Sequence, residues 1–235
     1  MTTAEYTTDL REVKTVAKSL LLMDIRKTEY SPIVVQHPFT SSGFTILPGK
    51  HLPIDITANA ENLKRWQDFV GSQIDRAKNA YEIYIQLNKP YGLTFLKYAK
   101  QYLSTEEMSA LLADAWIRSE NPNMDSNVTK RELVSMFEKA DKTLIMTGEE
   151  RKRLTEFGET VTVYRGVTPY NARNVKALSW TVDKKKAEWF AYRFGESGTV
   201  YKAQINKADI LAFFTSRDES EIVLNPNKLK QICAI

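Results

Sequence analysis

The spacing of the hydrophobic residues changes once along this 235-residue chain, after Gly158, and that change limits what the chain can fold into. Before it, apolar residues recur at helical intervals, as in 8–27 and 61–84. After it, runs rich in β-branched and aromatic residues surround one helical segment, 183–194. These runs are predicted strands: 161–166, 177–181, 199–205, 210–214, 220–224 and 229–235.

We therefore predict an α+β protein in two parts. Residues 1–150 form a mainly helical region, and residues 151–235 form a compact mixed β-sheet core of two packed sheets. The two parts could also make one continuous fold. Residues 31–59 hold four prolines and two glycines, so we expect extended chain and turns there.

The expected helix starts carry capping boxes, in which a hydroxyl residue precedes a glutamate by three positions. Each of these pairs can satisfy backbone N–H groups at the first turn of a helix. The pairs are Ser104 with Glu107, Thr129 with Glu132, and Thr147 with Glu150.

The sequence lacks the residues that disulfides, zinc sites and common nucleotide-binding motifs require. Cys233 is the only cysteine, so an internal disulfide is impossible, and His37 and His51 are the only histidines. Both histidines lie in segments that read as loop, so we expect no zinc site and no bound metal. The chain also lacks the glycine patterns of Rossmann and P-loop nucleotide sites.

The chain shows no targeting or membrane signal. Its start has no basic segment followed by an apolar one, and its apolar runs are too short to cross a bilayer. We therefore expect a cytoplasmic protein with no membrane partner.

Positive charge is concentrated in the last third of the chain. From Arg151 onward there are 15 Lys and Arg against 9 Asp and Glu, a net charge of +6, whereas the remainder carries −2. Such a basic part can attract a phosphate-bearing substrate or a nucleic acid. A solvated surface with no ligand is the alternative interpretation.

Three short elements in this basic part have residues suited to chemistry. Glu219 and Glu221 are separated by one residue at the start of a predicted strand, which places both carboxylates on one face. Paired carboxylates can stabilise positive charge at a sugar carbon. Arg165 follows a strand and precedes Gly166, and its guanidinium suits a diphosphate, while the glycine lets the backbone pass close to a ligand.

The third element is Ser179-Trp180-Thr181, a predicted strand in which the two hydroxyls share one face and can bond a carboxylate. Trp180 should then point into the core. Each of the three elements alone is also typical of an ordinary exposed strand edge.

Taken together and in this order, the elements resemble the Arg–Ser–Glu class of mono-ADP-ribosyltransferases. The resemblance runs from about Val161 to the C-terminus, and the helical part is similar to that of phage- and prophage-borne enzymes. Three motifs carry it: Val163-Tyr164-Arg165-Gly166, Leu178-Ser179-Trp180-Thr181 followed by a helix, and Glu219-Ser220-Glu221 leading into an apolar strand.

The resemblance implies that NAD is the substrate and that ADP-ribose passes to a macromolecule. Glu221 is the implied catalytic glutamate, which bonds the nicotinamide ribose and stabilises the oxocarbenium-like state. Ser179 is expected to hold Glu221. The implied NAD-binding residues are Arg165, Gly166, Ser179, Thr181 and Phe194.

The same resemblance implies an acceptor-reading turn before the glutamate pair. Glu219 is expected to orient or deprotonate the acceptor, and glutamate at this place goes with arginine acceptors in the family. The implied acceptor-recognition residues are Phe213, Phe214, Arg217 and Asp218.

The chain departs from the family pattern in two places. Trp180-Thr181 stands where Thr-Ser is usual, and the stretch after the helix, 195–198, is short, so how NAD is covered is not predicted. Alternatives remain open: an NAD glycohydrolase, or a non-catalytic binding protein with the same fold. The acceptor could be protein or RNA, and the sequence names neither the oligomeric state nor a role as phage factor, toxin or regulator.

Overall fold

The computed structural model describes residues 7–235, apart from the side chains of Met124 and Phe194. It is an α+β protein, with about 48% of residues in helices and 20% in strands. The chain divides into two compact units, 1–120 and 121–235. None of the helices in the described part is long and apolar enough to cross a bilayer.

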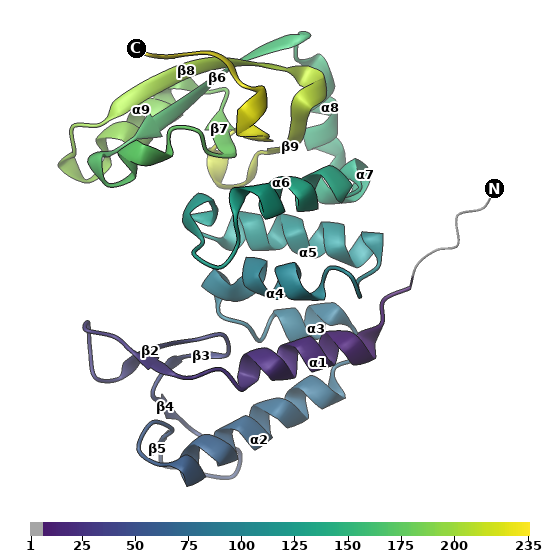
Figure 1. Ribbon diagram of the computed structural model, residues 1–235, viewed down its shortest axis with the longest axis vertical. Helices are drawn as coiled ribbons and strands as arrows, with labels where there is room; N and C mark the ends of the chain where they lie inside the picture. The colour runs from purple at the N-terminus through teal and green to yellow at the C-terminus, as the bar shows by residue number, and fades with distance from the viewer. Residues whose placement is uncertain (1–6) are drawn as a thin grey trace. The chain divides into compact units, whose positions relative to one another are not determined.

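The first unit consists of packed helices and two small sheets. Helix α1 packs against α2, α3 and α4, and α4 packs against α5 (Figure 1). The helices are α1 (Leu10–Leu21), α2 (Ala60–Arg76), α3 (Ala80–Tyr84), η1 (Lys89–Tyr91), α4 (Gly92–Ala99) and α5 (Thr105–Arg118). The strands are β1 (Arg26–Lys27), β2 (Val34–His37), β3 (Thr40–Ser42), β4 (Phe44–Thr45) and β5 (Ile54–Asp55).

Helix α1 shows why this unit folds as it does. Its apolar residues recur on one face, so Val13, Ala17 and Leu20 are all buried. Asp9 caps its start by accepting a hydrogen bond from the Glu12 N–H. The helix expected over 61–84 is interrupted after Arg76, because Asn79 caps a new start at Ala80.

His37 differs from the sequence expectation. It ends β2 and is 1% exposed, whereas His51 is exposed as expected of a loop residue. The His37 Nε2 lies 3.1 Å from the Met23 carbonyl, and its Nδ1 accepts from the Phe39 N–H. The ring also packs edge-on against Trp66. Periodicity over so short a strand could not predict this burial.

The second unit contains three helices followed by a six-stranded sheet. Its first elements are η2 (Pro122–Met124), α6 (Lys130–Lys139), α7 (Lys142–Ile145) and α8 (Gly148–Glu156). The strands are β6 (Thr160–Val167), β7 (Ser179–Thr181), β8 (Thr199–Asn206), β9 (Ile210–Phe214), β10 (Glu221–Leu224) and β11 (Lys230–Ala234). Between the strands lie η3 (Pro169–Asn174), α9 (Lys184–Tyr192), η4 (Arg193–Gly195), η5 (Lys207–Asp209), η6 (Ser216–Asp218) and η7 (Pro226–Lys228).

Helices α6, α7 and α8 belong to this second unit because all three pack against β9. The boundary at residues 120/121 therefore precedes the expected boundary at 150/151. Both capping boxes in these helices are complete, at Thr129–Glu132 and at Thr147–Glu150.

The sheet differs from the expectation of a mixed sheet in two packed layers. Its strand order is β11-β8-β6-β7-β10-β9, and every neighbouring pair is antiparallel. One residue pair, Tyr164 with Thr181, joins β6 to β7, so the two three-stranded halves meet at a narrow junction. Helix α9 packs against β6, β7 and β8 (Figure 1).

Candidate functional site

The three sequence motifs meet on adjacent strands. Strand β7 lies between β6 and β10, so the arginine, serine and glutamate motifs lie on successive strands although Arg165 and Glu221 are 56 positions apart in the chain (221 − 165). Thr181 pairs with Tyr164 of β6 on one side and with Glu221 of β10 on the other. Arg165 directly follows Tyr164, the β6 member of this paired row of three residues. The candidate site therefore lies at the junction of the two half-sheets.

Arg165 is held at the junction by one strong bond. Its Nη1 donates to the Ser179 carbonyl oxygen at 2.6 Å. Its Nε is buried and has no hydrogen-bond partner within the described part of the chain. A buried donor without a partner is costly, and a bound ligand is one way to satisfy it.

The charge state of Arg165 reflects both burial and a neighbour. Burial lowers the pKa of the guanidinium to about 10, although the Glu221 carboxylate opposes this shift by favouring the charged form. Arg165 therefore remains protonated at neutral pH, and the electrostatic interaction brings together an arginine and a glutamate from two different motifs.

Glu221 is the first residue of β10, and its side chain is buried with the residue 6% exposed. The other residues of this strand are also buried, so both faces of β10 are covered. From the sequence, Glu221 is expected to project from the start of the strand, and an ordinary exposed strand edge is the alternative interpretation. The structure encloses its carboxylate, and its electrostatic interaction with Arg165 is therefore stronger than it would be in water.

The Thr181 hydroxyl is used differently from the expectation, whereas the expected bond from the Ser179 hydroxyl to Glu221 stays a prediction. Thr181 Oγ1 donates to the Glu219 carbonyl at 2.7 Å and accepts from the Asp183 N–H at 3.0 Å, so it holds backbone and not a carboxylate. Ser179 pairs with Val223, two residues along from Glu221, and its carbonyl holds Arg165. Trp180 is buried as expected, at 2% exposure.

Gly166 serves helix packing. A Cβ built at this position would lie 2.0 Å from the Ala187 carbonyl oxygen and 2.6 Å from the Ala191 nitrogen, both in α9. The close approach of a helix therefore accounts for the glycine at this position, and its expected contact with NAD stays a prediction. A similar packing occurs at Gly198, where a Cβ would lie 2.1 Å from the Ala191 carbonyl oxygen.

Glu219 does not continue the strand that begins at Glu221. The backbone between them turns, because Arg217, Asp218 and Ser220 have φ values of 58°, 54° and 44°. The expected shared face of Glu219 and Glu221 is therefore wrong. Left-handed φ values are unfavourable for residues with a Cβ, so surrounding contacts must hold this turn in place.

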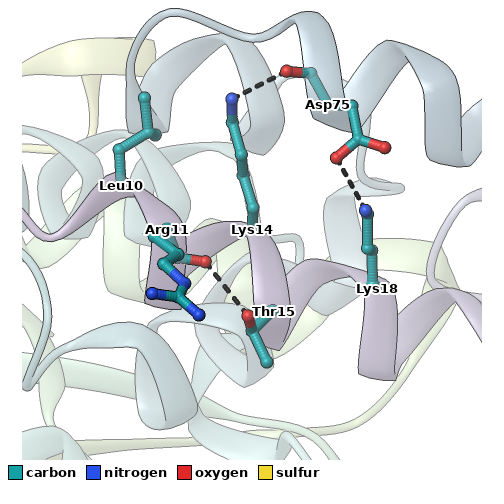
Figure 2. A pocket seen from close by; sticks show the side chains of 6 residues that line it. All are labelled: Leu10, Arg11, Lys14, Thr15, Lys18 and Asp75. Atoms are coloured by element: carbon teal, nitrogen blue, oxygen red, sulfur yellow. Dashed lines mark hydrogen bonds and ion pairs between the residues drawn. The ribbon is translucent and has the colours of Figure 1, made fainter.

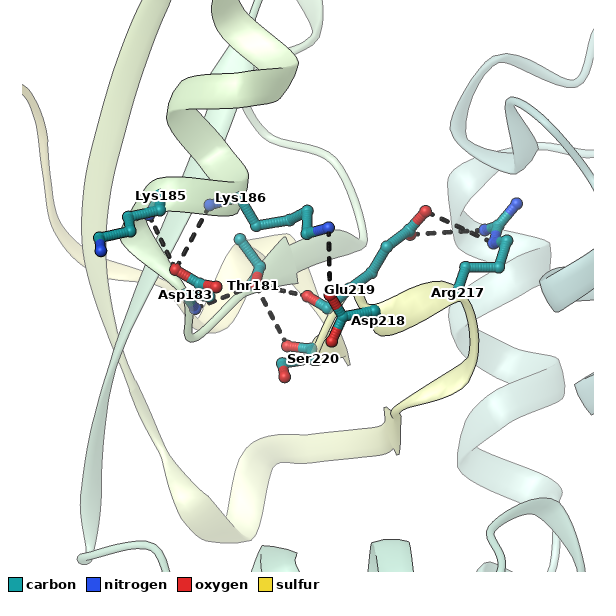
Figure 3. A network of polar contacts seen from close by, with 8 residues as sticks. All are labelled: Thr181, Asp183, Lys185, Lys186, Arg217, Asp218, Glu219 and Ser220. Carbon is teal, nitrogen blue, oxygen red and sulfur yellow. Dashed lines mark hydrogen bonds and ion pairs between the residues drawn. The ribbon is translucent and has the colours of Figure 1, made fainter.

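Ion pairs and hydrogen bonds surround the turn (Figure 3). Arg217 approaches Glu219, with Nε 3.4 Å from one carboxylate oxygen and Nη2 3.5 Å from the other. Lys186, at the start of α9, lies 3.7 Å from the exposed Asp218 carboxylate. Figure 3 shows the Glu219 and Arg217 side chains directed toward each other, away from Thr181.

Two of the expected acceptor-recognition residues are core residues. Phe213 and Phe214 are 0% and 1% exposed, and Phe213 packs edge-on against Phe157. Burial excludes them from contact with a macromolecule in this structure, which leaves Arg217 and Asp218 as the exposed members. The side chain of Phe194 lies outside the described atoms, so its expected NAD contact has no structural description.

Two residues that support the site were missed. The Asn123 side-chain oxygen accepts from the Leu178 N–H at 2.9 Å and from the Ser179 N–H at 3.3 Å, so it fixes the start of β7. Glu150 accepts from the Thr215 N–H at 2.8 Å, just before the turn. In the sequence, Asn123 belongs to an Asn-Pro-Asn stretch that interrupts the helical pattern, and Glu150 belongs to a capping box. Neither pattern indicates the long-range hydrogen bonds that the two side chains form.

A separate pocket of about 320 Å³ lies on the first unit. Its lining residues are Leu10, Arg11, Lys14, Thr15, Lys18 and Asp75 (Figure 2). Lys14 donates to the Asp75 carbonyl, and Lys18 forms a 2.6 Å ion pair with the Asp75 carboxylate. These cations are used to join α1 to the end of α2, so the junction of β6, β7 and β10 is the stronger candidate site.

Comparisons of this chain with protein-family models, curated proteins and solved structures gave no match.

Proposed function

We propose that this protein transfers ADP-ribose from NAD to a macromolecular acceptor and releases nicotinamide. The observation that carries the proposal is the convergence of Arg165 and Glu221 at one strand junction, where the buried Nε of Arg165 has no partner in the described part of the chain. A guanidinium with a free donor suits a diphosphate, and a buried carboxylate that interacts with it electrostatically suits a ribose hydroxyl.

In the proposed reaction, one carboxylate stabilises the step in which nicotinamide departs and a second carboxylate accepts the acceptor's proton. Glu221 bonds the ribose 2′-hydroxyl and stabilises the positive charge that develops as the bond from C1′ to the nicotinamide nitrogen breaks. Glu219 lies outside the strand, next to the exposed turn, where it accepts the proton lost when an acceptor nitrogen bonds to C1′. Thr181 supports Glu219 through its backbone, which refines the role expected from sequence.

Arginine is the acceptor that the turn fits best. The Glu219 carboxylate already lies beside a guanidinium, that of Arg217, so its position suits the same group on an incoming protein. Phe213 and Phe214 have no part in this recognition. Nucleic acid as the acceptor, NAD hydrolysis without an acceptor and binding without catalysis are the other outcomes that an experiment must separate.

The test uses labelled NAD with wild-type protein and the Glu221→Gln variant. We expect wild type to label macromolecules of a cell lysate and the small guanidine agmatine, and the variant to lose about 10²–10³ in rate because a charge-stabilising group is removed. Melting curves serve as the folding control.

Nuclease and protease treatment of the labelled lysate identifies the acceptor class. Release of nicotinamide without labelling would indicate a glycohydrolase, and NAD binding without nicotinamide release would indicate a binding protein. Wild-type activity in the folded Glu221→Gln variant would contradict the assignment of Glu221.

A further inference from the structure

The turn that carries Glu219 is held from outside at both ends. At its far end, Thr181 Oγ1 donates to the Glu219 carbonyl oxygen at 2.7 Å. At its near end, the Glu150 carboxylate accepts from the Thr215 N–H at 2.8 Å and from the Thr215 hydroxyl at 3.2 Å. Between these two attachments lie two of the residues with left-handed φ, Arg217 and Asp218, and the third, Ser220, directly follows Glu219.

The two carboxylate oxygens of Glu150 accept hydrogen bonds from two different parts of the chain. One oxygen accepts from the Thr147 N–H and hydroxyl, both at 2.9 Å, and completes the capping box of α8. The other oxygen reaches Thr215, which is 65 residues away in the chain. The residue is 5% exposed, so the carboxylate is almost fully enclosed and its oxygens have four protein donors.

A helix cap requires only the first of these oxygens. Thr129 and Glu132 form the complete capping box of another α-helix in this unit, with the same cap bonds at 2.8 Å and 2.9 Å. The bonds from Glu150 to Thr215 therefore go beyond helix capping. They attach the end of β9 to α8 at the residue where the chain leaves the sheet and enters the turn.

We propose that Glu150 is a positioning residue for acceptor transfer, acting through Thr215 to hold the Glu219 turn in its left-handed conformation. This inference rests on the proposed function. Glu150 itself touches neither NAD nor the acceptor. The geometry required of Glu219 is strict, since small displacements of a reacting group reduce rates strongly. Loss of the attachment at Thr215 lets the turn relax. Arg165 keeps its bond to Ser179 of β7, and Glu221, which pairs with Phe214 of β9, keeps its second pairing with Thr181 of β7.

The experiment compares Glu150→Gln with Glu132→Gln in the full chain. A glutamine keeps one acceptor oxygen, so it can satisfy the cap or Thr215 but not both. Thr215→Val is the second variant, because it removes the hydroxyl and leaves the backbone N–H. Each variant is measured for transfer to agmatine, for NAD hydrolysis and for hydrogen exchange over residues 215–220 without NAD.

We expect Glu150→Gln to reduce transfer by about 10- to 100-fold, mainly through a higher KM for agmatine, and to leave NAD hydrolysis near wild type. Exchange over 215–220 should become faster. Thr215→Val should show the same pattern more weakly, Glu219→Gln should show the loss of transfer, and Glu132→Gln should resemble wild type.

Three results would overturn the inference: unchanged exchange at the turn, equal loss of transfer and hydrolysis, or the same loss in Glu132→Gln. Hydrogen exchange needs no NAD, so it tests the attachment independently of the reaction. If wild type neither transfers nor hydrolyses, the proposed function fails and the catalytic half of this inference fails with it, while exchange still decides whether Glu150 holds the turn.

Discussion

At the scale of single residues, Arg165 combines a structural cost with the phosphate-binding role that we propose for it. The Nη1 bond to the Ser179 carbonyl orients the guanidinium, while the buried Nε has no partner in the described chain. A lysine would keep the charge but present a single nitrogen, so it could not make the Ser179 bond and bind a phosphate in the same geometry.

We therefore expect Arg165→Lys to weaken NAD binding about 10-fold or more, which corresponds to the loss of one charged hydrogen bond. Calorimetric titration of NAD measures the effect, and melting curves report the fold. Arg173→Lys is the matched control, because Arg173 is exposed in η3 of the same unit. Equal affinity of the wild-type and Arg165→Lys proteins would remove Arg165 from the binding site.

At the scale of elements, the close contact of α9 with the sheet depends on a glycine, which has no side chain. Gly166 lies in the middle of the contact, where a Cβ would meet backbone atoms of α9 at 2.0 Å and 2.6 Å. Backbone atoms cannot turn away as the end of a flexible side chain can. Arg165 and Tyr164 precede this glycine on β6, so the helix contact also sets the position of the arginine motif.

Gly166→Ala should lower the free energy of unfolding by about 1–3 kcal/mol, because the added methyl group forces α9 from the sheet. Gly158→Ala provides the control, since the nearest atom to its added Cβ is 3.9 Å away. Chemical denaturation of both variants measures the difference. Equal stability of the two would show that α9 adjusts at little cost.

The strands of the second unit follow the sequence prediction closely. Alternation and β-branched content predicted 199–205 and 210–214, and the structure has β8 at Thr199–Asn206 and β9 at Ile210–Phe214. These signals are local, and each strand carries its own. The sequence also brought Arg165 and Glu221 into one hypothesis. In the structure their strands, β6 and β10, flank β7, and the two side chains interact electrostatically.

Other features depend on contacts that no local pattern encodes. The left-handed residues before Glu221 separate Glu219 from the strand, although simple alternation places the two glutamates on one face. Phe213 and Phe214 follow a strand pattern that does not reveal burial on both faces. The partners of Asn123 and Glu150 lie 55 and 65 residues away, which periodicity cannot detect.

At the scale of the whole molecule, each unit buries a titratable side chain whose charge state is linked to folding. Burial raises the pKa of Glu150 in the second unit, but bonds from Thr215 and Thr147 outweigh it and lower the pKa overall. Its contribution to stability is present above the ordinary value of 4.5 and is lost as the pH falls through the folded-state pKa.

His37 has the corresponding role in the first unit at higher pH. Burial lowers the pKa of His37 from 6.5, although the backbone bonds to Met23 and Leu21 oppose the shift. Protonation would add a hydrogen at Nδ1, which faces the Phe39 N–H and accepts from it. The unfolded chain therefore takes up the proton first, so the unfolding free energy should fall as the pH drops below 6.5 toward the folded-state pKa.

The last prediction isolates this effect with the two histidines of the chain. In His37→Gln the slope of unfolding free energy between about pH 7.5 and 5.5 should flatten, because the group that binds the proton on unfolding is gone. His51→Gln removes the exposed histidine and should keep the wild-type slope. Urea denaturation at several pH values, followed by circular dichroism, measures both. A wild-type slope in His37→Gln would show that its protonation is not linked to folding.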